Sequence, residues 1–581
     1  MATGRFFWLP LVFLFSACAV TAPELKEPPS DLTWEPTQPF VGQPKVPVPQ
    51  EAKALGHFLK GQILLGQGEF SEALQEYEAA VQADPANAYL RVRLATLYLR
   101  KGDLKRSLQE AEEAVRLDPK GIDNRLLLAG LYSATGSEAR AVERYDDVLG
   151  IDPNNQDALL YAGALELKLG DHDKALKYLE RLLALNPKSM LAHFYLGRLQ
   201  AKGQRYLAAE ESYRKALEIN PNSEPVLMDL ALVYELGGKS EEAVQTYKKL
   251  LQVNPQSAWA AKRLGELYVG QNKLDEALSQ FQRLESIEAD PRETRTRIGL
   301  IYFERGDFER AAMEFNLVLA ADPKNDRVRY YLGSTYVELK ADAKAIEEFE
   351  RIAQASDYFA DARIQMAYLY DRRNDLSKAI AAVKVALEKK KNQIEIMALL
   401  ASLYRKAKDI PKAIEVMEGV VALDPKADQA HFQLGALYDE NKNKEKTIEQ
   451  MKKAIELNPK NAAALNYLGY TWAEMGIHLD EAENLILRAL KIQPNDGFYI
   501  DSLGWVYYQK GDYHRAVEEL ERAVELASDD PAIIEHLADA YVKIGKPEWA
   551  LGRYKDALVR TKEEEQSKRI REKIQLLERK I

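Results

Sequence analysis

The chain has 581 residues, with 80 lysines and arginines against 90 aspartates and glutamates, so its formal net charge is -10. The two signs are mixed along the chain and build no basic face, which argues against a nucleic-acid partner. Cys18 is the only cysteine, so no intramolecular disulfide can form.

The first residues have the composition of an export signal. Arg5 is the only charged side chain before Cys18, and residues 6–15 form an apolar run that Pro10 interrupts. This run is shorter than a helix that spans a bilayer, which needs about 20 residues. A short apolar run that ends in small residues predicts a signal peptide over residues 1–17.

Ser16 and Ala17 stand directly before Cys18. Small residues in front of a lone cysteine resemble the lipobox of bacterial lipoproteins, although Phe15 stands where leucine is most frequent. The resemblance implies cleavage before Cys18 and a diacylglycerol group on its thiol; an ordinary secretory signal with an incidental cysteine is the alternative. No aspartate follows Cys18, so similarity to the enterobacterial sorting rule, which varies between bacteria, implies outer-membrane anchoring that faces the periplasm.

Residues 18–50 join this cysteine to the rest of the chain. Eight prolines lie in this segment, where apolar residues show little periodicity: Pro23, Pro28, Pro29, Pro36, Pro39, Pro44, Pro47 and Pro49. Proline-rich segments adopt extended conformations of roughly 3 Å per residue. We therefore predict a tether here and not a domain.

From about residue 51 one pattern returns every 34 residues. A ladder of prolines marks it: Pro85, Pro119, Pro153, Pro187, Pro221 and Pro255, and later Pro425 and Pro459. Within each period a glycine or alanine such as Gly197 recurs, followed by two alanines such as Ala209 and Ala216 with an aromatic residue between them, Tyr213 in this period. Small residues let two helices cross closely, and the aromatic side chain fills the remaining space. The pattern resembles the tetratricopeptide repeat, a helix-turn-helix unit of the same length.

This resemblance implies an all-α solenoid. Residues 51–564 would hold about fifteen helix-turn-helix repeats, stacked as a right-handed superhelix with an extended concave surface. In residues 565–581, Ile570, Ile574, Leu577 and Ile581 recur at helical spacing. That spacing predicts a capping helix over the last repeat.

Three repeats depart from the ladder of prolines. Pro291 comes two residues late, and Asp357 and Lys391 stand where the closing proline belongs. Because proline ends the second helix of a repeat, we expect looser stacking or a bend between about residues 320 and 394.

The sequence contains no recognisable catalytic constellation. Its seven histidines are scattered, and no two of them form a metal-binding motif. Residues 237–240 read Gly-Gly-Lys-Ser and resemble the end of a phosphate-binding loop, but Val233 occupies the place of its first glycine. We therefore predict a protein that is not an enzyme, with no catalytic residue, no metal and no cofactor.

In the tetratricopeptide repeat family, five positions on the first helix of each repeat line the concave groove. Carried onto this chain, these positions include eleven residues that we take as protein-binding candidates: Phe194, Trp259, Phe303, Tyr330, Tyr368, Phe432, Tyr470, Phe498, Asp501, Trp505 and Tyr508. Aromatic residues on an open wall favour a binding surface, because they dominate binding energy at interfaces. Packing between repeats is the alternative, and we expect it for about half of them.

Three segments of the C-terminal third carry a second resemblance. Residues 466–470, 496–505 and 530–541 look like the C-terminal repeats of a group of proteobacterial outer-membrane lipoproteins with tetratricopeptide repeats. Some members are adaptors that hold a periplasmic carboxyl-terminal processing protease and present cell-wall hydrolases to it. The resemblance implies an adaptor of this kind, with periplasmic protein partners and a peptide ligand that has both charged and apolar anchors.

Two other functions stay open. The first is a scaffold lipoprotein of an exopolysaccharide synthesis and export complex, or of another envelope assembly. The second is an envelope enzyme or carrier with a site hidden at the groove. The segment 496–505 favours the adaptor, and the lack of a metal, nucleophile or phosphate motif disfavours the enzyme.

Overall fold

The computed structural model describes residues 48–579. These residues form 31 α-helices and no strand. The signal peptide, Cys18 and most of the tether predicted from the sequence lie outside the described residues. Within residues 48–579, no helix has both the length and the apolar character that are needed to cross a membrane.

The chain divides into two compact units, Met1–Leu199 and Gln200–Ile581. The first unit contains α1 (Gln50–Gln67), α2 (Phe70–Ala83), α3 (Ala88–Lys101), α4 (Leu104–Leu117), α5 (Ile122–Ala134), α6 (Glu138–Ile151), α7 (Gln156–Leu169), α8 (His172–Leu185) and most of α9 (Met190–Lys202). The second unit contains the end of α9 and then α10 (Tyr206–Ile219), α11 (Glu224–Leu236), α12 (Ser240–Val253), α13 (Ala258–Gly270), α14 (Leu274–Ile287), α15 (Arg292–Glu304), α16 (Phe308–Ala321), α17 (Asp326–Glu338), α18 (Asp342–Glu350), α19 (Phe359–Arg372), α20 (Leu376–Lys389), α21 (Ile394–Lys406), α22 (Ile410–Leu423), α23 (Asp428–Glu440), α24 (Lys444–Leu457), α25 (Ala462–Met475), α26 (Leu479–Ile492), α27 (Gly497–Lys510), α28 (Tyr513–Leu526), α29 (Pro531–Lys543), α30 (Pro547–Arg560) and α31 (Glu564–Glu578).

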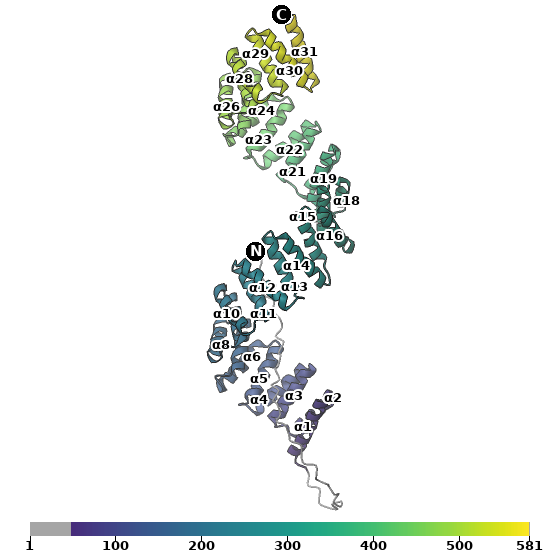
Figure 1. The fold of residues 1–581 in the computed structure, drawn as a ribbon, viewed down its shortest axis with the longest axis vertical. Coiled ribbons are helices and arrows are strands. Elements are labelled where there is room, and N and C mark those ends of the chain that lie inside the picture. Colours follow the sequence, from purple (N-terminus) through teal and green to yellow (C-terminus); the bar gives the residue numbers. More distant parts are fainter. Residues whose placement is uncertain (1–47, 580–581) are drawn as a thin grey trace, which may run out of the picture. The chain divides into compact units, whose positions relative to one another are not determined.

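Within each unit, an odd-numbered helix and the following even-numbered helix pack as an antiparallel pair, and each pair stacks on the next (Figure 1). Short polar residues begin the helices: the side chain of Asn87 accepts the Leu90 N–H of α3 at 3.2 Å, and Asp103 caps α4 in the same way. Gly102 ends α3 in the left-handed conformation, with φ 83°. Pro85 lies in the turn between two pairs, where no helix has to continue.

The small residue of each repeat lies where the two helices of a pair cross. A Cβ atom on Gly333 of α17 would lie 2.5 Å from Cε1 of Phe349 on α18, and one on Gly299 of α15 would lie 2.6 Å from the Phe315 ring of α16. Both rings are fully buried. The close approach explains why glycine and a large apolar residue recur together in the repeat.

Replacing Gly333 with alanine therefore separates two effects of glycine in a helix. We expect Gly333→Ala to lower the free energy of unfolding by about 1–3 kcal/mol, because the new methyl group displaces the Phe349 ring. Gly130 lies inside α5 with no atom within 4 Å of a Cβ built on it, so Gly130→Ala should raise stability by up to about 1 kcal/mol through helix propensity. Urea unfolding measures both changes in the free energy of unfolding. If the two variants changed it in the same direction, this explanation would be contradicted.

The ninth repeat departs from the others. Its second helix, α18, has nine residues, whereas α14 and α20 have fourteen although their closing prolines are also displaced or replaced. The chain forms turns from Arg351 to Tyr358, the stretch in which Asp357 replaces the proline. Arg363 of α19 donates a hydrogen bond to the carbonyl oxygen of Phe349 at 2.9 Å. The same carbonyl accepts the Ile352 N–H at a longer 3.4 Å, so a side chain of the next repeat adds a shorter hydrogen bond at the end of the shortened helix.

The last helix, α31, packs on the end of the array. It buries Ile570, Ile574 and Leu577 in the same apolar core as Tyr554 of α30 and Leu537 of α29. A solenoid needs such a cover, because the last repeat has no following repeat to shield its apolar side.

Candidate protein-binding surface

The eleven candidate groove residues all lie on the first helices of their pairs, from α9 to α27. Tyr368 and Phe498 are exposed, whereas Phe194 and Asp501 are buried. The other seven are half-buried: Trp259, Phe303, Tyr330, Phe432, Tyr470, Trp505 and Tyr508. The positions selected by the repeat pattern therefore differ widely in what they offer to a partner.

Several of these rings are held by neighbours within the array. The guanidinium of Arg198 lies 4.4 Å from the ring centre of Phe194. Trp259 meets Tyr247 edge to face, with ring centres 5.5 Å apart. The rings of Phe303, Tyr330 and Phe432 also contact aromatic rings of other helices. These side chains pack helices together and leave only part of their surface for a partner.

The candidates gather most densely on α27. Asp496 begins this helix by accepting the N–H of Phe498 at 2.9 Å. From there the helical repeat places Asp501, Trp505 and Tyr508 on one face, because residues four and three positions apart lie above one another. Phe498 stays 56% exposed at the start of the helix.

His536 of α29 joins this face of α27. The ring of Trp505 stacks on Tyr508, with centres 4.6 Å apart and planes 5° apart, and also on His536, at 4.2 Å and 21°. The carboxylate of Asp501 accepts a hydrogen bond from Nδ1 of His536 at 2.9 Å. Tyr470 of α25 lies 6.4 Å from the same imidazole. We call Tyr470, Asp501, Trp505, Tyr508 and His536 the C-terminal wall.

Charge is already balanced within the C-terminal wall. Burial opposes protonation of His536, but the neighbouring Asp501 carboxylate outweighs it, and Asp539 and Glu535 add to the effect, so the pKa of the imidazole is raised. Burial also raises the pKa of Tyr508 to about 12. Asp501 is only 6% exposed. The wall therefore offers aromatic surface to a partner and no free carboxylate.

A second charged group lies beside the wall, between α29 and α31. Arg569 donates to Glu535 at 2.8 and 2.9 Å, and Lys573 donates to Asp539 at 2.6 Å and to Glu535 at 2.9 Å. Burial by itself raises the pKa of Glu535, but its hydrogen bonds with Arg569 and Lys573 lower it to about 2. No group of histidine, cysteine and carboxylate side chains in the described part of the chain could hold a metal ion.

Sequence reasoning selected Asp501 and the aromatic residues of α27 but missed the groups that pair with this surface. His536 is one of seven scattered histidines in the sequence, and the prediction of a capping helix assigned no role to Arg569 and Lys573. A signal was nevertheless present: these two cations stand 34 residues after Glu535 and Asp539. Helix α31 thus continues the repeat register, with opposite charges at equivalent positions.

Known repeat families match most of the array. A model described as tetratricopeptide repeat matches residues 58–122, 126–179, 162–224 and 296–360. Further models, described as tetratricopeptide repeat or TPR repeat, match residues 237–293, 428–461 and 504–545. Together they cover more than half of the chain. This chain is a tetratricopeptide repeat protein.

Individual relatives are similar over shorter stretches or in fold. A TPR repeat-containing protein of Pseudomonas aeruginosa is 42% identical over 69 residues, which make up 12% of this chain and 12% of that protein. A tetratricopeptide repeat protein from Parabacteroides merdae is 22% identical over 43% of this chain and 98% of its own, with a TM-score of 0.35. Yeast Tom70 is 14% identical over 91% of this chain and 96% of its own, with a TM-score of 0.32.

Tetratricopeptide repeats act by presenting stacked helices to other polypeptides. The tetratricopeptide repeats of this chain imply a protein-protein interaction scaffold. The C-terminal wall contains the stacked rings of Trp505 and Tyr508, and the exposed Phe498 lies on the same helix, α27. This is the part of the described chain where candidate binding residues lie closest together.

Proposed function

We propose that this tetratricopeptide repeat protein is an envelope adaptor. It holds a periplasmic carboxyl-terminal processing protease and brings cell-wall hydrolases to it for proteolysis. A lipid on Cys18 anchors it in the outer membrane, facing the periplasm, and the proline-rich tether carries the repeats away from the bilayer. The resemblance of residues 466–470, 496–505 and 530–541 to adaptor lipoproteins supports the choice of partner.

The observation that carries the proposal is the aromatic surface of α27. Phe498 is exposed, and Trp505 and Tyr508 are stacked and half-buried, so they are held in one conformation before a partner arrives. Rigid aromatic side chains lose little conformational entropy on binding and dominate interface energies. Because Asp501 is paired with His536, recognition rests on apolar contact more than on charge.

An affinity purification tests the proposal in the full membrane-anchored chain. After gentle crosslinking, we expect the wild type to retain a periplasmic protease. Phe498→Ala and the double variant Trp505→Ala, Tyr508→Ala should each lower its recovery at least about tenfold, because truncated hot-spot residues cost about 2 kcal/mol or more. Leu207→Ala on α10 is the matched control. Leu207 is 74% exposed and far in the sequence from α27, so recovery of the protease should stay at the wild-type level.

Circular dichroism must accompany the capture, since Trp505 also stacks on His536. A large loss of helicity in the double variant would assign Trp505 to the core, and Phe498→Ala alone would then decide. Equal recovery of the protease from wild type and Phe498→Ala would place the contact elsewhere. Recovery of polysaccharide-export components in place of a protease would favour the exopolysaccharide scaffold.

A further inference from the structure

The first helix of the array has an apolar side that stays exposed within residues 48–579. Leu55, Leu59 and Ile63 of α1 follow one another at intervals of four residues, so they lie along one side of the helix. All three are more than half exposed, and Ile63 is 60% exposed. We call these three residues the α1 stripe. A row of large exposed apolar side chains marks a surface that another segment can cover.

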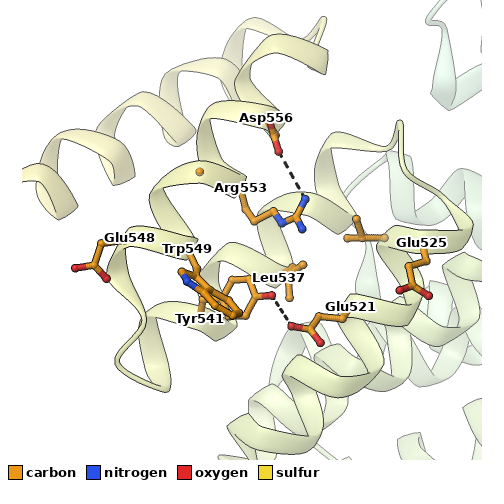
Figure 2. Close-up of a pocket in the computed structure, with 10 residues that line it drawn as sticks. Glu521, Glu525, Leu537, Tyr541, Glu548, Trp549, Arg553 and Asp556 are labelled. Atoms are coloured by element: carbon orange, nitrogen blue, oxygen red, sulfur yellow. Dashed lines mark hydrogen bonds and ion pairs between the residues drawn. The ribbon is translucent and has the colours of Figure 1, made fainter.

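The repeat register shows that this side of a first helix is an interface elsewhere in the array. Ile63 corresponds to Leu97 of α3, which is 6% exposed and lies in one apolar core with Leu74 of the preceding helix, α2. The corresponding residues of the next four first helices are buried as well: Leu131, Leu165, Leu199 and Val233. Figure 2 shows a contact of this kind near the C-terminus, where the Tyr541 hydroxyl of α29 meets Glu521 of α28. No described helix precedes α1, so its stripe stays open.

Two glycines on the same side of α1 have no contact that requires them. No atom lies within 4 Å of a Cβ built on Gly56 or Gly66, whereas a Cβ on Gly61 would lie 2.8 Å from the Tyr77 ring. Glycine inside a helix lowers its stability relative to alanine. The packing of the described helices therefore explains Gly61 but not Gly56 and Gly66. Beside the α1 stripe, these two glycines let another backbone approach the helix closely.

The segment that directly precedes α1 is long enough to cover the α1 stripe. The tether predicted for residues 18–50 contains two aromatic residues, Trp34 and Phe40. The nine residues 41–49 separate Phe40 from α1, and at roughly 3 Å per residue they span about 27 Å. Ile63, the far end of the stripe, lies about 20 Å along the helix axis from the start of α1. The aromatic residues can therefore reach the whole stripe.

The composition of this part of the tether also fits the exposed side of α1. Residues 34–41 read Trp-Glu-Pro-Thr-Gln-Pro-Phe-Val. The two prolines restrict the backbone, so docking costs less conformational entropy. Lys53 and Lys60 border one edge of the exposed side and complement Glu35, although Lys60 also pairs with Glu76 at 2.6 Å. Because the segment and α1 belong to one chain, the high effective concentration makes a weak contact sufficient.

We propose that residues 34–41 fold back on α1, where Trp34 and Phe40 cover the α1 stripe. This segment then shields the apolar side of the first repeat, as α31 shields that of the last repeat. The sixteen residues 18–33 still separate Cys18 from the docked segment, a reach of roughly 50 Å. The docking depends neither on a protease partner nor on a lipid at Cys18.

Photocrosslinking in the full chain tests this. The chain, reconstituted in vesicles of phosphatidylethanolamine and phosphatidylglycerol, carries p-benzoylphenylalanine in place of Leu59. Isotope-labelled and unlabelled chains are mixed, so that mass spectrometry separates crosslinks within one chain from crosslinks between two chains. We expect crosslinks from position 59 to residues 31–42 of the same chain. The same group in place of Met313, an exposed residue of α16, should give no crosslink to that segment.

Two variants of the tether are matched to this experiment. The double variant Trp34→Ala, Phe40→Ala should lower the yield of the crosslink at least about fivefold, because it removes both aromatic anchors. Leu25→Ala truncates an apolar side chain of the same tether outside residues 34–41, so the yield should stay within about twofold of wild type. Neither variant changes a residue of α1. In the double variant without the photoreactive group, hydrogen exchange should rise in α1 and stay at the wild-type level in α5.

Four results would overturn the proposal. Crosslinks that join differently labelled chains would show that a second copy covers α1, and adducts with lipid would show that the membrane surface does. A yield at position 59 no higher than at position 313 would mean that the tether stays away from α1. An undiminished crosslink in the double variant would remove Trp34 and Phe40 from the contact.

Discussion

Replacing both Arg569 and Lys573 with alanine should destabilise the C-terminal repeats by about 3–5 kcal/mol, because it leaves the buried carboxylate of Glu535 without a cation. Glu535 is buried and makes hydrogen bonds to both cations at 2.8 to 2.9 Å. Solenoid repeats contact only their neighbours, so the loss should be local. Hydrogen exchange should rise in α29, α30 and α31 and stay at the wild-type level in α19.

A surface ion pair provides the control for this double variant. The exposed side chain of Arg116 pairs with Glu113 on α4, so Arg116→Ala should cost no more than about 1 kcal/mol. The ion pairs between α29 and α31 would be dispensable, contrary to expectation, if the double variant exchanged its amide hydrogens as slowly as wild type.

The same ion pairs set a pH dependence with a defined sign. Burial raises the pKa of Glu535, but Arg569 and Lys573 lower it to about 2, below the ordinary value of 4.5. A lowered pKa means that the ionised form stabilises the fold. This contribution is fully present above pH 4.5 and is lost as the pH falls toward 2. The double variant should lack this part of the acid sensitivity, because protonation of its Glu535 no longer breaks an ion pair.

The second large effect is expected at the crossing of α17 and α18. Phe349→Ala should lower the free energy of unfolding by about 3–5 kcal/mol, because it empties a fully buried site. The Phe349 ring fills the space over Gly333 and lies 5.7 Å from the ring of Tyr330. Helix α18 has only nine residues, so few other contacts hold it in place. Urea unfolding followed by circular dichroism gives the change.

Met313 on α16 is the control for Phe349. It is exposed, so Met313→Ala should change the free energy of unfolding by less than about 0.5 kcal/mol. A similarly small effect of Phe349→Ala would mean that the ninth repeat adds little to the stability of its unit. Phe349 would then fill the space at this crossing without a large contribution to the free energy of unfolding.

The repeat architecture could be predicted from the sequence because a single pattern carries it. Glycines such as Gly333 stand at a fixed distance from large residues such as Phe349, and the structure brings them into contact at the crossing of two helices. Periodicity of this kind is local and repeated, so it survives without knowledge of the rest of the fold. The periodicity could not predict the shortened α18, because the length of that helix depends on the turns that follow it and on Arg363 of the next repeat.

The candidate binding surface could be predicted only in part, because position in a repeat does not fix exposure. Phe194 and Phe498 stand at groove positions of their repeats, but Arg198 covers the first ring whereas the second stays open. Asp501 has a partner 35 residues away, His536, on the first helix of the next repeat. Such contacts depend on how neighbouring repeats stack, and no spacing within one repeat encodes them.

The most direct test of the proposed adaptor role places a photoreactive group on α27, the helix that carries most of the C-terminal wall. The full chain, expressed in its own envelope, would carry p-benzoylphenylalanine in place of Phe498, and a second version would carry it in place of the exposed Leu207. The expected result is a covalent adduct of a periplasmic carboxyl-terminal processing protease from position 498 and none from position 207. Adducts without such a protease at 498, or equal adducts at both positions, would contradict the proposal.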